Sequence, residues 1–69
     1  MALVPPHRGQ LFVDPEGRRW HVDGVVHLPK TQQGGHFIVS LKHGENELVL
    51  SSADFHSLVR RGTLRPVVH

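Results

Sequence analysis

The side chains best suited to chemistry in this chain are its histidines, of which it has seven, against no cysteine. Three of them, His21, His27 and His36, lie within sixteen positions. Imidazole titrates near neutral pH and is the commonest metal ligand, so this group raises two hypotheses, an acid–base site and a metal site. The absence of cysteine excludes disulfides and thiolate zinc sites. The spacing of the three rings along and across their strands tests these hypotheses.

Short strands separated by turn residues are the elements that position these rings. Alternating apolar and polar residues predict strands at 11–13, 18–28, 36–42 and 47–50, and a last short strand at 63–67. The segment 14–17, Asp-Pro-Glu-Gly, fits a type I turn with a bulged glycine, which sets Phe12 opposite Trp20. Ser51 fits an N-cap and Gly62 a C-terminal stop, so a short helix is expected over 52–61.

The alternation also predicts which side chains face the core. In the strand at 18–28 the even positions Trp20, Val22, Val26 and Leu28 form the apolar face, and Val25 is expected to point outward. Gly24 in the middle of this strand indicates a bend or a bulge. Ile38 and Val49, on the next two strands, are expected to point outward as well.

The expected register keeps the histidines from forming a metal site. His21 and His27 are six residues apart on one strand, which separates them by roughly 20 Å. If Leu28 opposes Phe37, His27 and His36 become diagonal neighbours on the outer face, roughly 7–8 Å apart. A zinc site needs three or four ligands, and no third one is near. We therefore interpret the histidines as polar side chains on the exposed face and expect no metal and no cofactor.

The chain also lacks the local patterns of known catalytic sites. It has no nucleophile elbow and no zincin helix, and its Gly34-Gly35 pair does not open a helix that could bind phosphate. We therefore expect that the protein is not an enzyme.

Composition sets the broad class. Eight lysines and arginines against six acidic residues give a net charge of +2 and a pI near 10, which suits an acidic partner only weakly because the charges are mixed along the chain. No apolar run approaches the roughly 18 residues that a membrane span needs. The lack of cysteine is typical of a cytoplasmic protein, and that location is expected.

The order of elements is hairpin, polar loop, hairpin, short helix and last strand. It resembles the small SH3-like barrel superfamily over about residues 10–67. The resemblance implies a mainly β fold, a small SH3-like barrel of about five strands with one short helix before the last strand. We expect an extended N-terminal arm at 1–9 and a single domain at 10–69. A partly open OB-like barrel is the structural alternative.

An apolar outer surface suggests a binding module. Val25, Ile38 and Val49 interrupt the polar pattern on three successive strands, and such patches mark partner sites. With Lys30, Gln32 and Gln33 of the polar loop at 29–35 they predict a protein–protein adaptor or regulator that binds a protein partner or a second copy. The alternative is that residues 3–6 of the arm fold over the patch.

A basic rim supports a second hypothesis, a module that binds DNA or RNA. Its side chains would be Arg18, Arg19, Arg60, Arg61 and Arg65, with Lys30. Trp20 is in phase with the core and so is not expected to stack on bases. The same arginines also fit a solvated rim whose last members complement the helix dipole. The adaptor is the primary prediction and nucleic-acid binding is its alternative.

Overall fold

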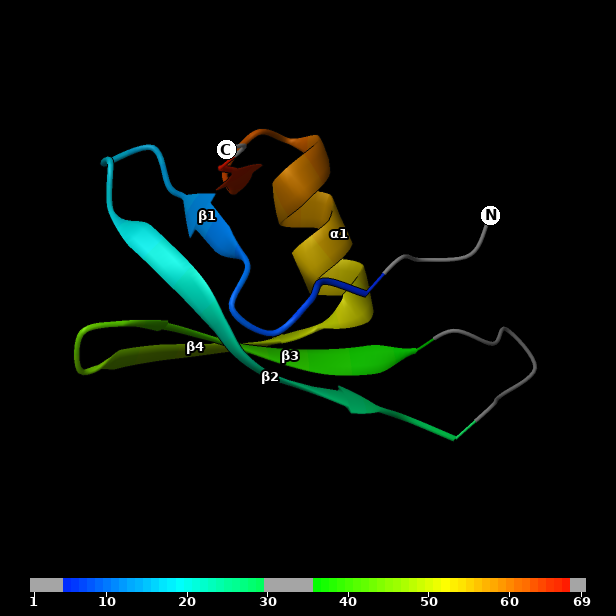
Figure 1. The fold of residues 1–69 in the computed structure, drawn as a ribbon. Helices are drawn as coiled ribbons and strands as arrows, with labels where there is room; N and C mark the ends of the chain where they lie inside the picture. The colour runs from blue at the N-terminus through cyan, green and yellow to red at the C-terminus, as the bar shows by residue number, and fades with distance from the viewer. Residues whose placement is uncertain (1–4, 30–35, 68–69) are drawn as a thin grey trace.

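Five antiparallel strands form one sheet, and a short helix covers one side of it. The computed structural model describes residues 5–29 and 36–67. Its elements are β1 (Leu11–Val13), β2 (Arg19–His27), β3 (Phe37–His43), β4 (Asn46–Ser51), α1 (Ser52–Arg60) and β5 (Arg65–Pro66). The strand order across the sheet is β4-β3-β2-β1-β5 (Figure 1). The expected mainly β fold with one short helix before the last strand is confirmed over the described residues.

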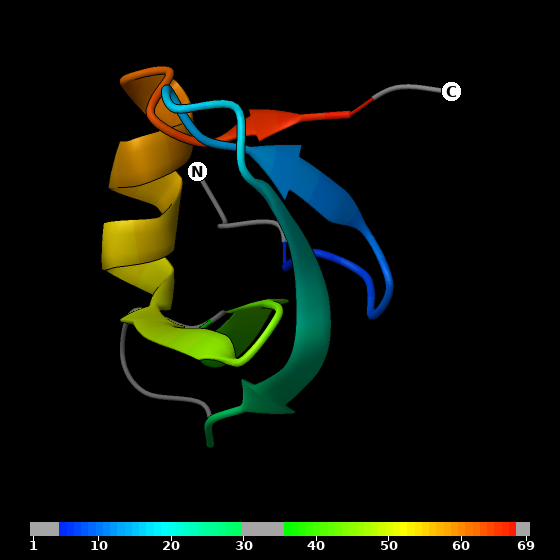
Figure 2. The same cartoon turned by 90° about the vertical axis from the view of Figure 1, so that its left-hand side faces the viewer.

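The sheet bends along β2, which belongs to both of its halves. The first residues of β2 pair with β1, and the rest of the strand pairs with β3. Figure 2 shows β2 curving from β1 and β5 at the top to β3 and β4 at the bottom, with α1 on the side that the curve encloses. We call that side the concave face and the opposite side the outer face.

The core fills the concave face and holds α1 in place. It consists of Phe12, Trp20, Val22, Phe37, Val39, Leu41, Phe55 and Leu64. Phe55 of α1 contacts both halves of the sheet: its ring centroid lies 5.3 Å from that of Phe12 in β1 and 6.2 Å from that of Phe37 in β3, both edge to face. Such aromatic pairs add to the free energy of simple burial. One helix side chain therefore ties the two halves together.

Local turn chemistry behaves as the sequence predicts. Asp14 O accepts from Gly17 N at 3.0 Å, Gly17 has a φ of 84°, and Phe12 pairs with Trp20. Ser51 Oγ accepts from Asp54 N at 3.2 Å, which confirms the N-cap.

The helix ends in a Schellman motif, which fits the predicted glycine stop. Thr63 N donates to Leu58 O at 2.9 Å, and Gly62 takes a φ of 78°. A positive φ of this kind suits glycine because it lacks a Cβ. The chain therefore turns sharply from α1 towards β5.

A bulge in β2 reverses the expected facing of its second half. The predicted irregularity near Gly24 is confirmed, because the register against β3 shifts between Val22 and Gly24. The extra residue, Asp23, changes the alternation, since a shift by one residue exchanges the two faces of a strand. Val25 consequently packs against the core, whereas Val26 and Leu28 are exposed. The expectation that Val25 points outward, and Val26 and Leu28 inward, was wrong.

The described part of the N-terminal arm lies on the concave face. Gly9 N donates to Val22 O at 2.8 Å, and Val22 N donates to Gln10 O at 2.9 Å, so the chain joins the sheet just before β1. Pro5 and Pro6 help line a hollow of about 290 Å³ whose other walls include the core ring of Phe12. These two prolines therefore do not cover the outer face. Residues 3 and 4 lie outside the described part of the chain.

Candidate functional site

Exposed apolar side chains gather on the outer face of β2, β3 and β4. Among the described residues, the large hydrophobic side chains that are exposed are those of Val26 (62%), Val49 (60%), Leu28 (40%) and Ile38 (36%). We call these four residues the outer apolar face. Ile38 and Val49 face outward, as the sequence predicts. In β2 and just after it, Val26 and Leu28 take the place on this face that was predicted for Val25.

The sheet register brings these four side chains together. Val26 pairs directly with Ile38, which places their Cβ atoms about 5 Å apart. Ile38 pairs with Ser51, so Val49 is its diagonal neighbour at roughly 7–8 Å. Leu28 follows the end of β2 and its N donates to His36 O at 3.0 Å, which continues the strand pairing. The four residues thus form one continuous patch across three strands.

Charged side chains border this patch along the outer surface. Lys42 Nζ lies 3.6 Å from Asp23 Oδ2, and Ser40 Oγ donates to Glu47 Oε2 at 3.0 Å. Ser40 lies in the same row as Gly24 and Val49, whereas Lys42 and Glu47 pair with each other one row further along the outer face. An apolar centre with a polar border is the usual anatomy of a protein–protein interface.

The polar loop that was expected to extend this surface lies outside the described residues. Lys30, Gln32 and Gln33 all fall in the segment 30–35. Their predicted role in partner binding stays a prediction.

The predicted basic rim is divided among three parts of the molecule, the first of which is the turn after β1. Arg18 Nε lies 2.7 Å from Asp14 Oδ2, and an Arg18 terminal nitrogen lies 3.4 Å from Glu16 Oε2. These two carboxylates balance its charge and raise the pKa of Arg18, and the hydrogen bond that Arg18 donates to Asp14 is the main cause. Arg18 is therefore engaged by two carboxylates of its own turn, although its side chain stays half-exposed.

The second part is a row of side chains across β1. Val13 pairs with Arg19 on one side and with Arg65 on the other. Since paired residues face the same side of a sheet, the two arginines flank Val13 about 10 Å apart, on the outer face. Both are exposed. They form a small basic row, separate from the outer apolar face.

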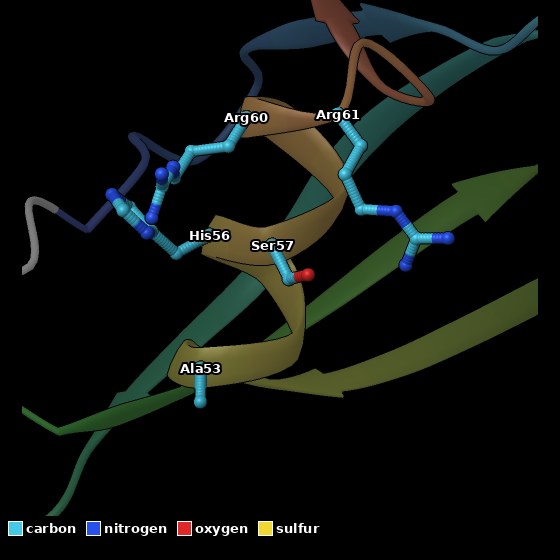
Figure 3. A pocket seen from close by; sticks show the side chains of 5 residues that line it. All are labelled: Ala53, His56, Ser57, Arg60 and Arg61. Carbon is cyan, nitrogen blue, oxygen red and sulfur yellow. The ribbon is translucent and has the colours of Figure 1, made fainter.

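The third part is the solvent side of α1. Arg60 and Arg61 help line a hollow of about 410 Å³ with Ala53, His56 and Ser57 (Figure 3). Figure 3 shows the side chains of His56 and Arg60 on one side of the helix and that of Arg61 on the other. All five residues belong to α1 and its C-cap, so a ligand here would be held from one side. The five arginines accordingly do not form one surface.

Asp14 is the most densely hydrogen-bonded side chain described, and the sequence prediction used it only as a turn residue. It is buried, and its carboxylate accepts from Glu16 N and Arg18 N, both at 2.9 Å, from Arg18 Nε at 2.7 Å, and from Trp20 Nε1 at 3.1 Å. Burial acts to raise its pKa, but the hydrogen bonds from Trp20 and Arg18 outweigh it and hold the pKa of Asp14 well below its usual range. Asp14 thus locks the turn onto the core.

A third hollow, of about 430 Å³, opens beside this network. It lies between the turn at 14–18 and the C-terminal end of α1, with Trp20, Leu48 and Leu58 among its apolar lining residues. Asp14 also lines this hollow, but both of its carboxylate oxygens already accept two hydrogen bonds within the network. The other ionisable side chains among its described lining residues, Glu16 and Arg18, lie 3.4 Å apart as an ion pair.

The histidines are not arranged as the expected register proposed. His27 pairs with Phe37, so the predicted pairing of Leu28 with Phe37 was wrong by one residue. The bulge at Asp23 prevents the predicted pair, because after it Leu28 faces outward while Phe37 faces the core. His36 Nδ1 lies 3.5 Å from Ser52 Oγ at the start of α1. Within residues 5–29 and 36–67, no three His, Asp or Glu side chains are grouped closely enough to hold a metal ion.

His43 has a structural contact of its own. Its Nδ1 lies 3.0 Å from Arg19 O, so the Nδ1–H tautomer donates there, and its ring centroid lies 5.6 Å from that of Trp20. His43 therefore helps to cover the core indole at the sheet surface.

Comparison with known proteins gives no relative from which a role could be carried over. No protein family matches the chain, and no curated protein and no solved structure shows significant similarity to it. No helix in the described ranges is long and apolar enough to cross a membrane. Function is therefore argued from the surface itself.

Proposed function

We propose that this chain is a small non-enzymatic binding module of the SH3-like barrel kind, a protein–protein adaptor or regulator that docks its partner on the outer apolar face. One observation carries the proposal. Every large hydrophobic side chain that is exposed among the described residues lies on that face. Scattered exposed hydrophobic residues are ordinary, but a contiguous group with a polar border is a feature of interaction sites.

The energetics support docking at this position. Val26 and Val49 are more than half exposed, so a partner that covers them gains the free energy of removing their side chains from water. The strands beneath are held by the core residues Val39 and Leu41, which are fully buried. The patch is thus presented on a rigid surface, which lowers the entropic cost of binding.

Site-specific photo-cross-linking tests the proposal. A benzophenone amino acid replaces Val26 in one variant and Ser57, on the solvent side of α1, in a matched control. In cells that naturally produce the protein, we expect one discrete protein adduct from position 26 and none from position 57. Adding Ile38→Lys to the first variant should remove the adduct, because a charge would then lie in the centre of the patch. Equal adducts from both positions, or an adduct that Ile38→Lys leaves unchanged, would contradict the proposal.

Nucleic-acid binding is the second candidate, and the row formed by Arg19, Val13 and Arg65 is the observation that favours it. Arg19 in β2 and Arg65 in β5 lie on either side of β1, and both are exposed. Neither has an ion-pair partner among the described residues. An NMR titration with short random-sequence DNA and RNA at low and moderate salt tests it. Shifts at Arg19 and Arg65 that fade with salt would support this candidate, since phosphate contacts are salt-dependent. Their absence would leave the adaptor alone.

A further inference from the structure

The two edges of the sheet differ in how they are protected from pairing with another strand. The edge strand β5 has only two residues, and one of them is Pro66, which has no N–H to donate. The opposite edge strand, β4, has six residues and reads Asn-Glu-Leu-Val-Leu-Ser. It contains no proline, no lysine and no bulge against β3. Short length, proline and charge are the usual means of blocking an edge, and β4 has only Glu47.

An edge strand leaves half of its backbone N–H and C=O groups without a partner in the sheet. In β4 these unpaired backbone groups belong to a strand with three consecutive apolar residues, Leu48, Val49 and Leu50. Figure 2 shows β4 at the end of the sheet, with α1 rising from its last residue on the concave side. Among the described residues no strand pairs with the edge of β4 that faces away from β3, so this edge is available for pairing.

We propose that β4 pairs antiparallel with β4 of a second copy, so that two sheets join into one across a two-fold axis at Val49. This proposal extends the proposed function, since it joins the outer apolar faces of two copies, but it rests on a separate observation, the unprotected edge.

The sequence of β4 is self-complementary in this register. With Val49 on the axis, Val49 lies opposite the partner's Val49, and Glu47 lies opposite the partner's Ser51. Leu48 lies opposite the partner's Leu50 on the concave side. No like charges face each other, and every apolar residue of β4 meets another apolar residue.

Other registers are poorer. An axis at Leu48 sets Glu47 opposite the partner's Val49, so a carboxylate would lie against an apolar side chain. An axis at Glu47 sets the two glutamates against each other, which is destabilising. Charge and apolar matching therefore favour the axis at Val49 over these two alternatives.

The pairing has a consequence for docking. Val26, Ile38 and Val49 of one copy become continuous with the same three residues of the other. A partner would then meet one strip of valine and isoleucine that spans both subunits, which is larger than the patch of one copy. Neither half of this strip is complete without the second copy.

A single engineered cysteine tests the pairing, because the chain has no cysteine of its own. In Val49→Cys the two thiols lie opposite each other across the axis, about 5 Å apart between Cβ atoms. The matched control is Val26→Cys, an equally exposed position two strands away from the edge. With copper-phenanthroline as oxidant at micromolar protein, Val49→Cys should form a disulfide-linked dimer roughly 100-fold faster than the control, since pre-docked thiols have a millimolar effective concentration.

The mass of the unmodified protein gives a second readout that does not depend on the cysteine. Sedimentation equilibrium should give twice the chain mass of 7.7 kDa, falling to the chain mass in Val49→Glu and unchanged in Val26→Glu. Equal cross-linking from positions 49 and 26, or a monomer at all concentrations, would overturn the pairing. A monomer that still forms the position-26 adduct with a protein partner would overturn the pairing and leave the proposed function standing.

Discussion

A matched pair of substitutions tests the facing of the second half of β2, on which the outer apolar face depends. Val25 and Val26 are adjacent, and the bulge turns the first towards the core and the second towards water. Threonine has the shape of valine but carries a hydroxyl in place of one methyl, so Val25→Thr and Val26→Thr change polarity with little change in volume.

The expected magnitudes differ because only one site is packed against the core. At Val25, which is partly buried against the core, a hydroxyl without a partner costs about 1 kcal/mol of folding free energy, the lower end of the range for buried hydroxyls. At Val26, which is 62% exposed, the change should stay within about 0.5 kcal/mol, as exposed substitutions generally do. Threonine is also a good strand former, so backbone propensity does not obscure the comparison.

Urea unfolding followed by the fluorescence of Trp20 measures both variants. Trp20 is the single tryptophan and is buried in the core, so its emission reports on global unfolding. With a slope of about 1 kcal/mol per molar for a small domain, Val25→Thr should lower the midpoint by about 1 M. Val26→Thr should lower it by less than about 0.5 M. A larger loss in Val26→Thr than in Val25→Thr would refute the position of the bulge and, with it, the outer apolar face.

Three further changes test the framework that holds this face. Phe55→Ala should cost about 3–5 kcal/mol, a large part of the roughly 3–10 kcal/mol expected for a 69-residue domain. Circular dichroism should show a largely unfolded chain, and a cooperative unfolding transition like that of the wild type would contradict the packing of α1. Asp14→Asn should lower the thermal midpoint at pH 7. Because the pKa of Asp14 is depressed in the folded protein, its contribution to stability is present above about pH 4 and is lost at lower pH. The wild type should therefore lose stability between pH 4 and pH 2 more steeply than the variant, and parallel pH profiles of the two proteins would argue against the hydrogen-bond network. Ser51→Ala should cost about 1 kcal/mol in urea unfolding, since it removes the N-cap of α1; an unchanged midpoint would argue against the cap.

Turn and cap residues made much of the fold predictable. A turn of fixed length sets the register of its strands, which is why Phe12 was correctly paired with Trp20. The N-cap at Ser51 and the stop at Gly62 likewise located α1 to within a residue. These signals act over a few residues and need no knowledge of the tertiary structure.

The facing of the second half of β2 could not be read from the alternation. Val25 and Val26 are both apolar, and so are Ile38 and Val39, so either register offers an apolar residue to each face. Gly24 signalled an irregularity, but the sequence does not say that the extra residue is Asp23. Only the pairing with β3 decides this, and it moved the candidate site from Val25 to Val26 and Leu28.

The distribution of charge on the surface was even harder to predict from the sequence. The bond from the Trp20 indole to Asp14 spans six residues and forms only when the hairpin packs against the core. Similarly, the division of the arginines depends on which face of β5 carries Arg65. A composition with a pI near 10 thus overstated the basic surface, because Arg18 is paired inside the turn and the remaining arginines face different sides.

The central claim is that Val26, Ile38 and Val49 form a single apolar surface that water reaches in the free protein. Methyl-labelled NMR with a soluble paramagnetic reagent measures this directly, in dilute protein. We predict strong paramagnetic relaxation of the Val26, Ile38 and Val49 methyl groups, little relaxation at Val25 and Val39, and a nuclear Overhauser effect between Val26 and Ile38. Strong relaxation at Val25 with a protected Val26 would contradict the claim, because the outer apolar face would then not exist as described.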